Sequence, residues 1–156
     1  MLQIQQGCDH RCTFCIIPFG RGDSKSLPFD QINKRAERLI ESGYSEIVMT
    51  GVDLTSYGID LPGKPKLGNI LRRLLNFQPK LRRLRLSSID PAEIDDDLMD
   101  LLLNEKRILP HLHLSLQSGD NLILKRMKRR HNREEIIELC HDLSLTRSDF
   151  TFGADV

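Results

Sequence analysis

The alternation of short aliphatic segments with amphipathic ones most strongly limits what this chain can fold into. Residues 46–50 predict a strand, and the helix-like segment before them stops near Gly43, a residue type that often follows a helix. Strand-like segments alternate in this way with helices or loops along the chain, which predicts an α/β fold with a parallel sheet and right-handed crossovers. The expected strands are residues 2–6, 46–50, 81–87, 111–117 and 149–156, and the expected helices are residues 30–42, 67–77, 91–104, 121–127 and 133–145.

Two of these strands carry a polar face opposite a leucine-rich face. Along residues 111–117, His, Ser and Gln side chains alternate with Leu, and residues 81–87 alternate in the same way, with Leu81 on the polar face and Arg82 on the leucine face. The leucines are expected to pack under helices, and the polar faces to line a wet cavity. A closed eight-stranded barrel fills its interior with apolar side chains. The pattern therefore predicts a partial, open β/α barrel of about five parallel strands that holds a ligand inside.

The composition fits a single globular domain. The chain has 156 residues, 39% of them apolar, which is enough for a core, and its net charge of +1 says little about partners. No segment reads as a signal peptide or as a membrane span, so we expect no membrane association. Unpaired cysteines suit a reducing location, and we expect the protein to be cytoplasmic. Basic residues gather at 72–85 and 125–133, each run being either a solvated face or a surface for phosphate or carboxylate groups.

Three of the four cysteines lie in one loop after the first expected strand. Cys8, Cys12 and Cys15 have the spacing C-x3-C-x2-C, whereas Cys140 is distant and shares a helix face with apolar residues, as a small buried side chain does. Three thiolates leave a four-coordinate centre one ligand short. Three interpretations remain open: a structural zinc site completed by His10 or another His, a disulfide or redox loop, and a [4Fe–4S] cluster with one iron free to bind a small molecule.

Other candidate ligand contacts lie where expected strands end. Thr50-Gly51-Val52-Asp53 follows the second strand, with a Gly that allows close approach and an acid that can receive an ammonium or hydroxyl group. Ser115, Gln117 and Ser118 lie at the carboxyl end of the fourth strand, where ligands gather in β/α folds. His111 and His113 share a face and could share a metal, but they lie at the strand start, which favours a structural role.

The cysteine loop, with Phe14 just before Cys15, resembles the signature of the radical S-adenosylmethionine (SAM) superfamily. More closely, the chain resembles the central domain of the radical SAM methylthiotransferases, and the Thr-Gly-Val-Asp run resembles the branch that acts on threonylcarbamoyladenosine in tRNA. The matching runs cover nearly the whole chain. They are Gly7 to Pro18, Arg21-Gly22, Glu46 to Gly58, Leu84 to Pro91, His111 to Gly119, and Leu124 to Met127.

This resemblance implies a mechanism. Cys8, Cys12 and Cys15 would hold the [4Fe–4S] cluster, and the open iron would bind the amino and carboxylate groups of SAM. Reduction would cleave SAM to a 5′-deoxyadenosyl radical, which abstracts hydrogen from C2 of the adenine before a methylthio group is installed. By the same resemblance, Thr50, Gly51 and Asp53 match the turn that receives the SAM amino group, Ser115 and Gln117 match the strand that faces the ribose, and Arg129 and Arg133 fit a basic position near the SAM carboxylate or the RNA backbone.

The resemblance also implies what surrounds this chain. Family members carry an N-terminal domain with a second cluster and a C-terminal RNA-binding domain, so residues 1–156 are expected to be the radical SAM core alone and inactive by itself. The expected partners are tRNA and an electron donor protein. Two alternatives stay open: a radical SAM enzyme with another substrate, and a zinc-binding module without catalysis.

Overall fold

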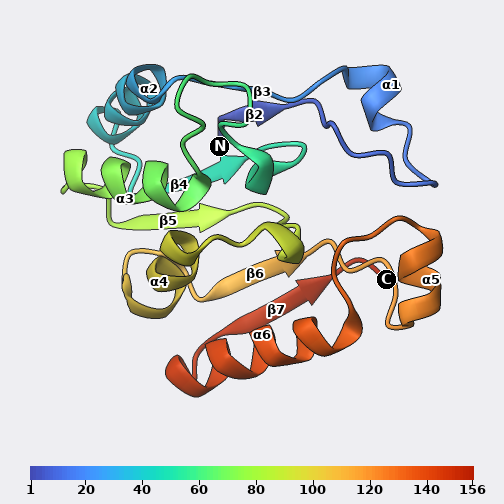
Figure 1. Cartoon of the computed structure of the whole chain (residues 1–156). Coiled ribbons are helices and arrows are strands. Elements are labelled where there is room, and N and C mark those ends of the chain that lie inside the picture. Colours follow the sequence, from blue (N-terminus) through green and yellow to red (C-terminus); the bar gives the residue numbers. More distant parts are fainter.

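Five parallel strands lie side by side in chain order in the computed structural model, which describes residues 1–156. β1, β4 and β5 pair in parallel in that order, and β6 pairs in parallel with β7. β5 and β6 meet only at two isolated bridges, Leu84 with Ile108 and Ile89 with Leu114. The sheet does not close, so the predicted partial β/α barrel is confirmed (Figure 1). The five strands are β1 (Leu2–Gln3), β4 (Glu46–Thr50), β5 (Arg83–Leu86), β6 (His111–Leu114) and β7 (Thr151–Ala154).

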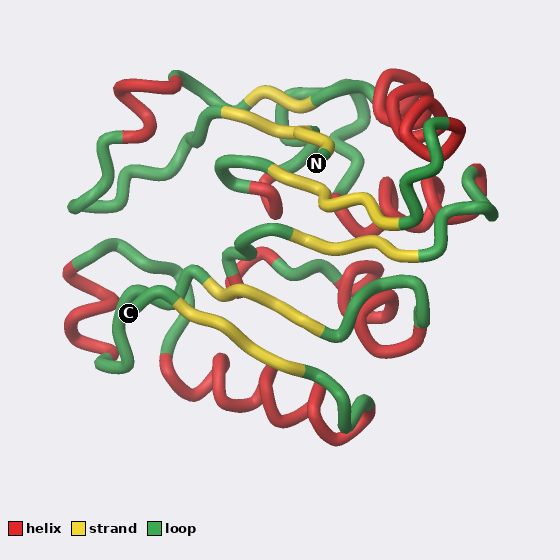
Figure 2. The backbone as a smooth tube through the Cα atoms, turned by 180° about the vertical axis from the view of Figure 1, so that it is seen from behind, coloured by secondary structure: helices red, strands yellow, loops and turns green.

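Four helices cover one face of this sheet, and Figure 2 shows the opposite face, on which no helix lies. β5 and β6 bury their leucines, including Leu84 and Leu112, both fully buried. The polar side chains between them are only half-buried or exposed, and Arg85 Nε lies 3.0 Å from Glu46 Oε1. The expected leucine face and polar face are thus confirmed. The covering helices are α2 (Phe29–Glu41), α3 (Leu67–Phe77), α4 (Asp96–Asn104) and α6 (Arg133–Thr146).

The expected pattern fails at the start of β5. The regular strand begins only at Arg83, so Leu81 and Arg82 precede it and do not follow its alternation. Leu81 is fully buried and Arg82 is exposed, the reverse of the expected faces.

Two expected strands are shorter than predicted because their chains change partner or direction. The segment 2–6 breaks at Ile4, where the chain leaves β4 and β2 (Gln5–Gln6) pairs antiparallel with β3 (Lys25–Ser26). β6 ends at Leu114, and Gln117 adopts a left-handed conformation with φ 74°. Ser115 and Gln117 therefore lie in the turn after β6 rather than within the strand.

The expected helix at residues 91–104 is two elements. A short 3-10 turn, η2 (Pro91–Glu93), is followed by extended backbone at Ile94, and Asp95 then caps α4 by accepting a 3.0 Å hydrogen bond from Leu98 N. Residues 16–22, after the cysteines, contain the short helix α1 (Ile17–Arg21) with a proline in its first turn. The helix α5 (Asn121–Arg126) and the 3-10 turn η1 (Leu54–Ser56) complete the fold.

The core is one apolar cluster of 27 buried residues between the helices and the sheet. Cys140 packs against it, as expected from its helix face. None of the helices combines the length and the apolar character that crossing a membrane requires.

The leucine face of β5 gives a first prediction. Leu84→Ala removes a fully buried side chain from the middle of the sheet. The free energy of unfolding, measured by urea denaturation, is expected to fall by about 2–5 kcal/mol. Arg82→Ala, at an exposed neighbouring position without an ion pair, is the matched control and is expected to change it by less than about 0.5 kcal/mol. Equal losses in the two variants would contradict the assigned faces.

Candidate active site

The cysteine loop is fixed to the rest of the protein at both ends. At its start, Gly7 has φ 72°, and a Cβ there would lie 2.0 Å from the carbonyl oxygen of Asp23, so this position requires glycine. Asp9 Oδ1 accepts a 2.8 Å hydrogen bond from Ser24 N. At the other end, Thr13 N donates to the carbonyl of Met127, just after α5, at 3.3 Å. The cysteine loop therefore connects the region of the first strands with the end of α5.

The three cysteines line one cavity of about 160 Å³ at the carboxyl ends of the strands. All three thiols are free and half-buried. Burial raises the pKa of Cys8 to about 12, so this thiol is neutral unless a metal displaces its proton. Of the residues predicted from sequence to contact SAM, four line the same cavity. These are Asp53, Ser115, Gln117 and Arg129.

A hydrogen-bonded cluster of His10, Asp53, Ser56 and Glu93 borders this cavity, and its members His10 and Asp53 line it. His10 Nε2 lies 3.0 Å from Asp53 Oδ2 and 3.3 Å from Glu93 Oε1. Ser56 Oγ lies 2.8 Å from a carboxylate oxygen of each acid. Hydrogen bonds to Asp53 and then Glu93 raise the pKa of His10 to about 10, so the imidazole is charged and balances part of the two carboxylates. We call these four residues the His10 wall.

Two consecutive arginines and Asp90 form a second charged group at the site, which joins the His10 wall through Arg130. Arg129 Nη2 donates to the carbonyl of Ser115 at 2.6 Å and lies 3.2 Å from Asp90 Oδ2, which also lies 2.8 Å from Arg130 Nη2. The other terminal nitrogen of Arg129, Nη1, lies 3.8 Å from Cys12 Sγ. The Arg129 side chain is only 7% exposed, and its Nε is buried without a partner. A buried cation is thus held directly against a cysteine sulfur.

The turn after β4 is positioned by Gln5, a residue that sequence reasoning misses. Gln5 is almost fully buried, and its Oε1 accepts a 2.8 Å hydrogen bond from Asp53 N. A Cβ on Gly51 would lie 2.9 Å from this same oxygen. The glycine at the strand end therefore admits Gln5, which fixes the backbone of Asp53. The hydrogen bonds of the Gln5 side chain have no counterpart in the periodic pattern of the sequence, so this role could not be predicted from it.

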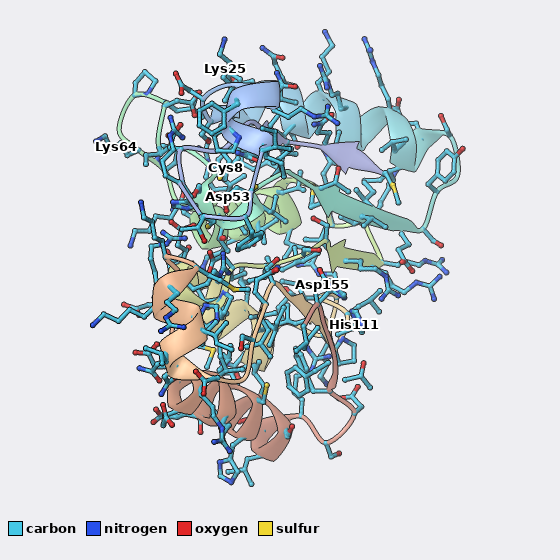
Figure 3. The ribbon with its side chains drawn as sticks, turned by 90° about the vertical axis from the view of Figure 1, so that its right-hand side faces the viewer. Cys8, Lys25, Asp53, Lys64, His111 and Asp155 are labelled. Carbon is cyan, nitrogen blue, oxygen red and sulfur yellow. The ribbon has the colours of Figure 1, made fainter.

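The structure does not bring every predicted residue into the cavity. Thr50 is the last residue of β4, and neither it nor Gly51 lines the cavity, although both immediately precede the residues that do. Arg133 is exposed at the start of α6 and outside the cavity. His111 and His113 lie at the start of β6, and Figure 3 shows His111 away from Cys8 and Asp53. His113 Nε2 lies 3.2 Å from Asp155 Oδ2.

Sequence reasoning also misses Asp90, Glu93 and Ser56. Asp90 and Glu93 follow β5, and Ser56 lies in the loop after β4, so all three come from the carboxyl edge of the sheet where ligands gather. Their position just after the predicted strands is the feature of the sequence from which they could have been predicted.

The donor set of the cavity fits a [4Fe–4S] cluster. Thiolates are the ligands of such clusters, and three lie here on one fixed loop with a buried arginine beside one of them. The ligand atoms of Cys8, His10 and Asp53 also lie within 4.8 Å of one another. That second group combines one thiol with an imidazole and a carboxylate, and Cys12 and Cys15 are not part of it.

The charge balance of the His10 wall leads to a prediction about acid stability. Burial raises the pKa of Glu93, but hydrogen bonds from His10, Arg130 and Ser56 outweigh it and bring the pKa to about 2. Because the folded-state pKa is below the ordinary value of 4.5, this carboxylate stabilises the fold above that pH, and the contribution is lost as pH falls toward 2.

In urea denaturation, Glu93→Gln is therefore expected to lower the free energy of unfolding by about 1–3 kcal/mol at pH 6, and by progressively less toward pH 3. Glu37→Gln, at an exposed position on α2 without an ion pair, is expected to have little effect at any pH. A Glu93→Gln deficit of constant size from pH 6 to pH 3 would show that the carboxylate is not stabilised by these partners.

The curated relatives are bacterial methylthiotransferases. The chain is 54% identical, over 155 residues, to the threonylcarbamoyladenosine tRNA methylthiotransferase MtaB of Rickettsia prowazekii, covering 99% of this chain and 37% of that protein. It is 37% identical, over 155 residues, to the tRNA-2-methylthio-N(6)-dimethylallyladenosine synthase of Pelagibacter ubique, covering 99% of this chain and 34% of that protein. The chain thus spans about a third of the length of the relatives it matches.

Two solved enzymes share the fold. The radical SAM methyltransferase TsrM from Kitasatospora setae, with cobalamin and a [4Fe–4S] cluster bound, matches with a TM-score of 0.71 and 16% identity, covering 97% of this chain and 29% of that one. The cobalamin-dependent radical enzyme OxsB, with aqua-cobalamin and SAM bound, matches with a TM-score of 0.74 and 15% identity, covering 98% and 23%. At these identities the likeness concerns the fold alone.

The radical SAM superfamily is the family whose sequence pattern matches here, and the match runs from residue 2 to residue 153. It includes the cysteine loop, all five parallel strands up to Gly153, and every residue that lines the cysteine cavity. The cofactors predicted from the sequence, a [4Fe–4S] cluster and SAM, are those of this superfamily. With its partial barrel and its three cysteines on one cavity, the chain belongs to the radical SAM superfamily.

Proposed function

We propose that this chain is the catalytic core of a tRNA methylthiotransferase that adds a methylthio group to C2 of N6-threonylcarbamoyladenosine. The observation that carries the proposal is the 54% identity, along 99% of the chain, to a relative named for that reaction. Identity to the relative named for dimethylallyladenosine is 37% over the same length. The substrate is therefore proposed from the larger similarity, and a radical SAM enzyme acting on another substrate is the alternative.

The cysteine cavity supplies the residues for both cofactors. Cys8, Cys12 and Cys15 would hold the cluster, and Asp53, with its backbone fixed by Gln5, would receive the amino group of SAM. When bound and reduced, the cluster supplies the electron that cleaves SAM to the 5′-deoxyadenosyl radical used to activate C2 of the base.

The other cavity residues hold and enclose these groups. Ser115 and Gln117, in the turn after β6, offer a hydroxyl and an amide for the ribose of SAM. Arg129 places positive charge beside Cys12, and hydrogen bonds to thiolate sulfurs are among the factors that set a cluster's reduction potential. Phe14 and Ile17 line the cavity as well and add apolar surface to it. Thr50 and Gly51 would act through the turn that they begin, and Arg133 would lie toward the RNA.

We further propose that residues 1–156 form the radical SAM core of a larger assembly. The chain spans about a third of its relatives' length, and the remainder is proposed to supply the second cluster and the RNA-binding surface. tRNA and an electron donor protein are the proposed partners, in the cytoplasm. On this proposal the core binds its cofactors but does not methylthiolate tRNA by itself.

The cluster ligands can be tested by anaerobic reconstitution with iron and sulfide. The chain is expected to bind about four irons, with an EPR spectrum after reduction that changes when SAM is added. Cys12→Ala is expected to lose most of the iron, whereas Cys140→Ala, a cysteine packed against the core outside the cavity, is expected to keep it. Stoichiometric zinc with no response to SAM would establish the structural metal site instead.

The substrate can be tested in cells. Deleting the gene segment that encodes this chain is expected to remove the methylthio group from threonylcarbamoyladenosine in tRNA hydrolysates, measured by mass spectrometry of nucleosides. Methylthiolated dimethylallyladenosine, where the organism makes it, is the internal control and is expected to stay unchanged. Loss of the control nucleoside alone would favour the alternative substrate, and restoration by a Cys12→Ala copy would contradict a role for the cluster.

A further inference from the structure

A second pocket, of about 340 Å³, lies on the other side of the His10 wall. Ser56 and Glu93 line this pocket, and both are hydrogen-bonded to residues that line the cysteine cavity. The two spaces are therefore neighbours that share a hydrogen-bonded partition. We call the second space the lysine pocket. It is lined by Thr55, Ser56, Tyr57, Ile59, Lys64, Lys66, Ala92, Glu93, Ile94 and Asp95.

The acids of the lysine pocket are already occupied. Glu93 accepts hydrogen bonds from Ser56 and Arg130 and lies beside His10. Asp95 Oδ1 accepts from Leu98 N at 3.0 Å, and Asp95 Oδ2 accepts from the backbone of α3 at 3.2 Å.

The two lysines of the pocket, in contrast, are free. Neither Lys64 nor Lys66 has a carboxylate oxygen within 4.0 Å of its ammonium nitrogen. Two exposed lysines without ion partners therefore line the pocket.

These lysines come from a loop that is itself held in place. A Cβ on Gly58 would lie 1.8 Å from the carbonyl oxygen of Pro65, so the two arms of the loop are in direct contact. Gly58 N donates to Ser26 Oγ at 2.8 Å, and Ser26 N donates to Asp60 Oδ2 at 3.0 Å. Lys64 adopts a left-handed conformation with φ 43° directly after Gly63. The loop is folded rather than extended, and Figure 3 shows Lys64 at the edge of the half of the molecule that carries Cys8 and Asp53.

The other cations near the proposed active site are neutralised. His10 lies against Asp53 and Glu93, and the two arginines, Arg129 and Arg130, both contact Asp90. An anionic part of a substrate would meet unpaired positive charge, among the residues lining the two spaces, only at Lys64 and Lys66. The threonylcarbamoyl group of the proposed substrate carries a carboxylate, whereas a dimethylallyl group is uncharged.

We propose that the lysine pocket binds an oxyanion of the RNA substrate through Lys64 and Lys66. The inference rests on the proposed function. The carboxylate of the threonylcarbamoyl group is the oxyanion that we favour. It belongs to the same base whose C2 would face the cysteine cavity, and the lysine pocket lies just across the His10 wall from that cavity. Tyr57, Ile59 and Ile94 add apolar surface for the methyl group of the threonyl moiety. A backbone phosphate next to the base is the other source of the same chemistry.

Binding of three nucleosides to the reconstituted chain with SAM tests the proposal. The probes are N6-threonylcarbamoyladenosine, its methyl ester and N6-dimethylallyladenosine, measured by isothermal titration. If the lysines hold the carboxylate, the acid is expected to bind about tenfold more tightly than the ester, as one charged hydrogen bond provides. Lys64→Gln/Lys66→Gln is expected to abolish that preference. Lys80→Gln, an exposed lysine before β5 at the opposite end of the strands, is the matched control and is expected to retain it.

An RNA stem-loop with an unmodified adenosine separates the two sources of the anion. If Lys64→Gln/Lys66→Gln weakens binding of this unmodified RNA as much as it weakens binding of the modified RNA, the lysines bind a backbone phosphate. Lys66→Gln alone guards against misfolding, because Lys66 has extended backbone (φ −86°, ψ 163°) without the left-handed strain of Lys64.

The proposal is overturned if acid and ester bind the unaltered chain equally and the double variant also binds the RNA normally. That result would leave the proposed function standing if the gene deletion still removes the methylthio group from threonylcarbamoyladenosine. If the deletion affects another nucleoside instead, the proposed function fails, while the RNA comparison still reports on the oxyanion site.

Discussion

The burial of one leucine face of the sheet is the constraint on which the site depends. Leu84 and Leu112 are fully buried beneath helices, so the side chains that alternate with them must point to the bare face. Because the five strands are parallel and follow one another in chain order, all their carboxyl ends meet at one edge. The cysteine loop, the turn after β4 and the segments after β5 and β6 converge there without any long-range sequence signal.

Charge pairing then fixes how these loops meet. His10 from the cysteine loop contacts acids from two other loops, and Arg129 and Arg130 bring the segment before α6 onto Asp90. Buried charges are tolerated only when they are paired and hydrogen-bonded, so each of these groups restricts where the next one can lie. The result is a cavity whose polar walls are already organised by the protein, which is what a site for a charged cofactor requires.

The sequence predicted the elements well and the contacts between them poorly. Strand β4 and helix α3 were predicted with their observed bounds, because an apolar run or a helical period is a local pattern. The end of β6 was misplaced because Gln117 takes a left-handed conformation that its residue type does not announce. The spacing of the three cysteines singled them out, and they do line one cavity, but the contacts of Gln5 and Glu93 arise only when distant loops are brought together.

The same logic explains why the two sides of the His10 wall differ in character. On the cysteine side the cations are paired with acids of the protein, so the charges of that side largely balance one another. On the lysine side Asp95 caps α4 and Glu93 pairs with His10 and Arg130, so neither acid pairs with Lys64 or Lys66. If the proposed function holds, a substrate with a negative group on the N6 side of its base would gain from that asymmetry, and a base with an apolar group in the same place would not.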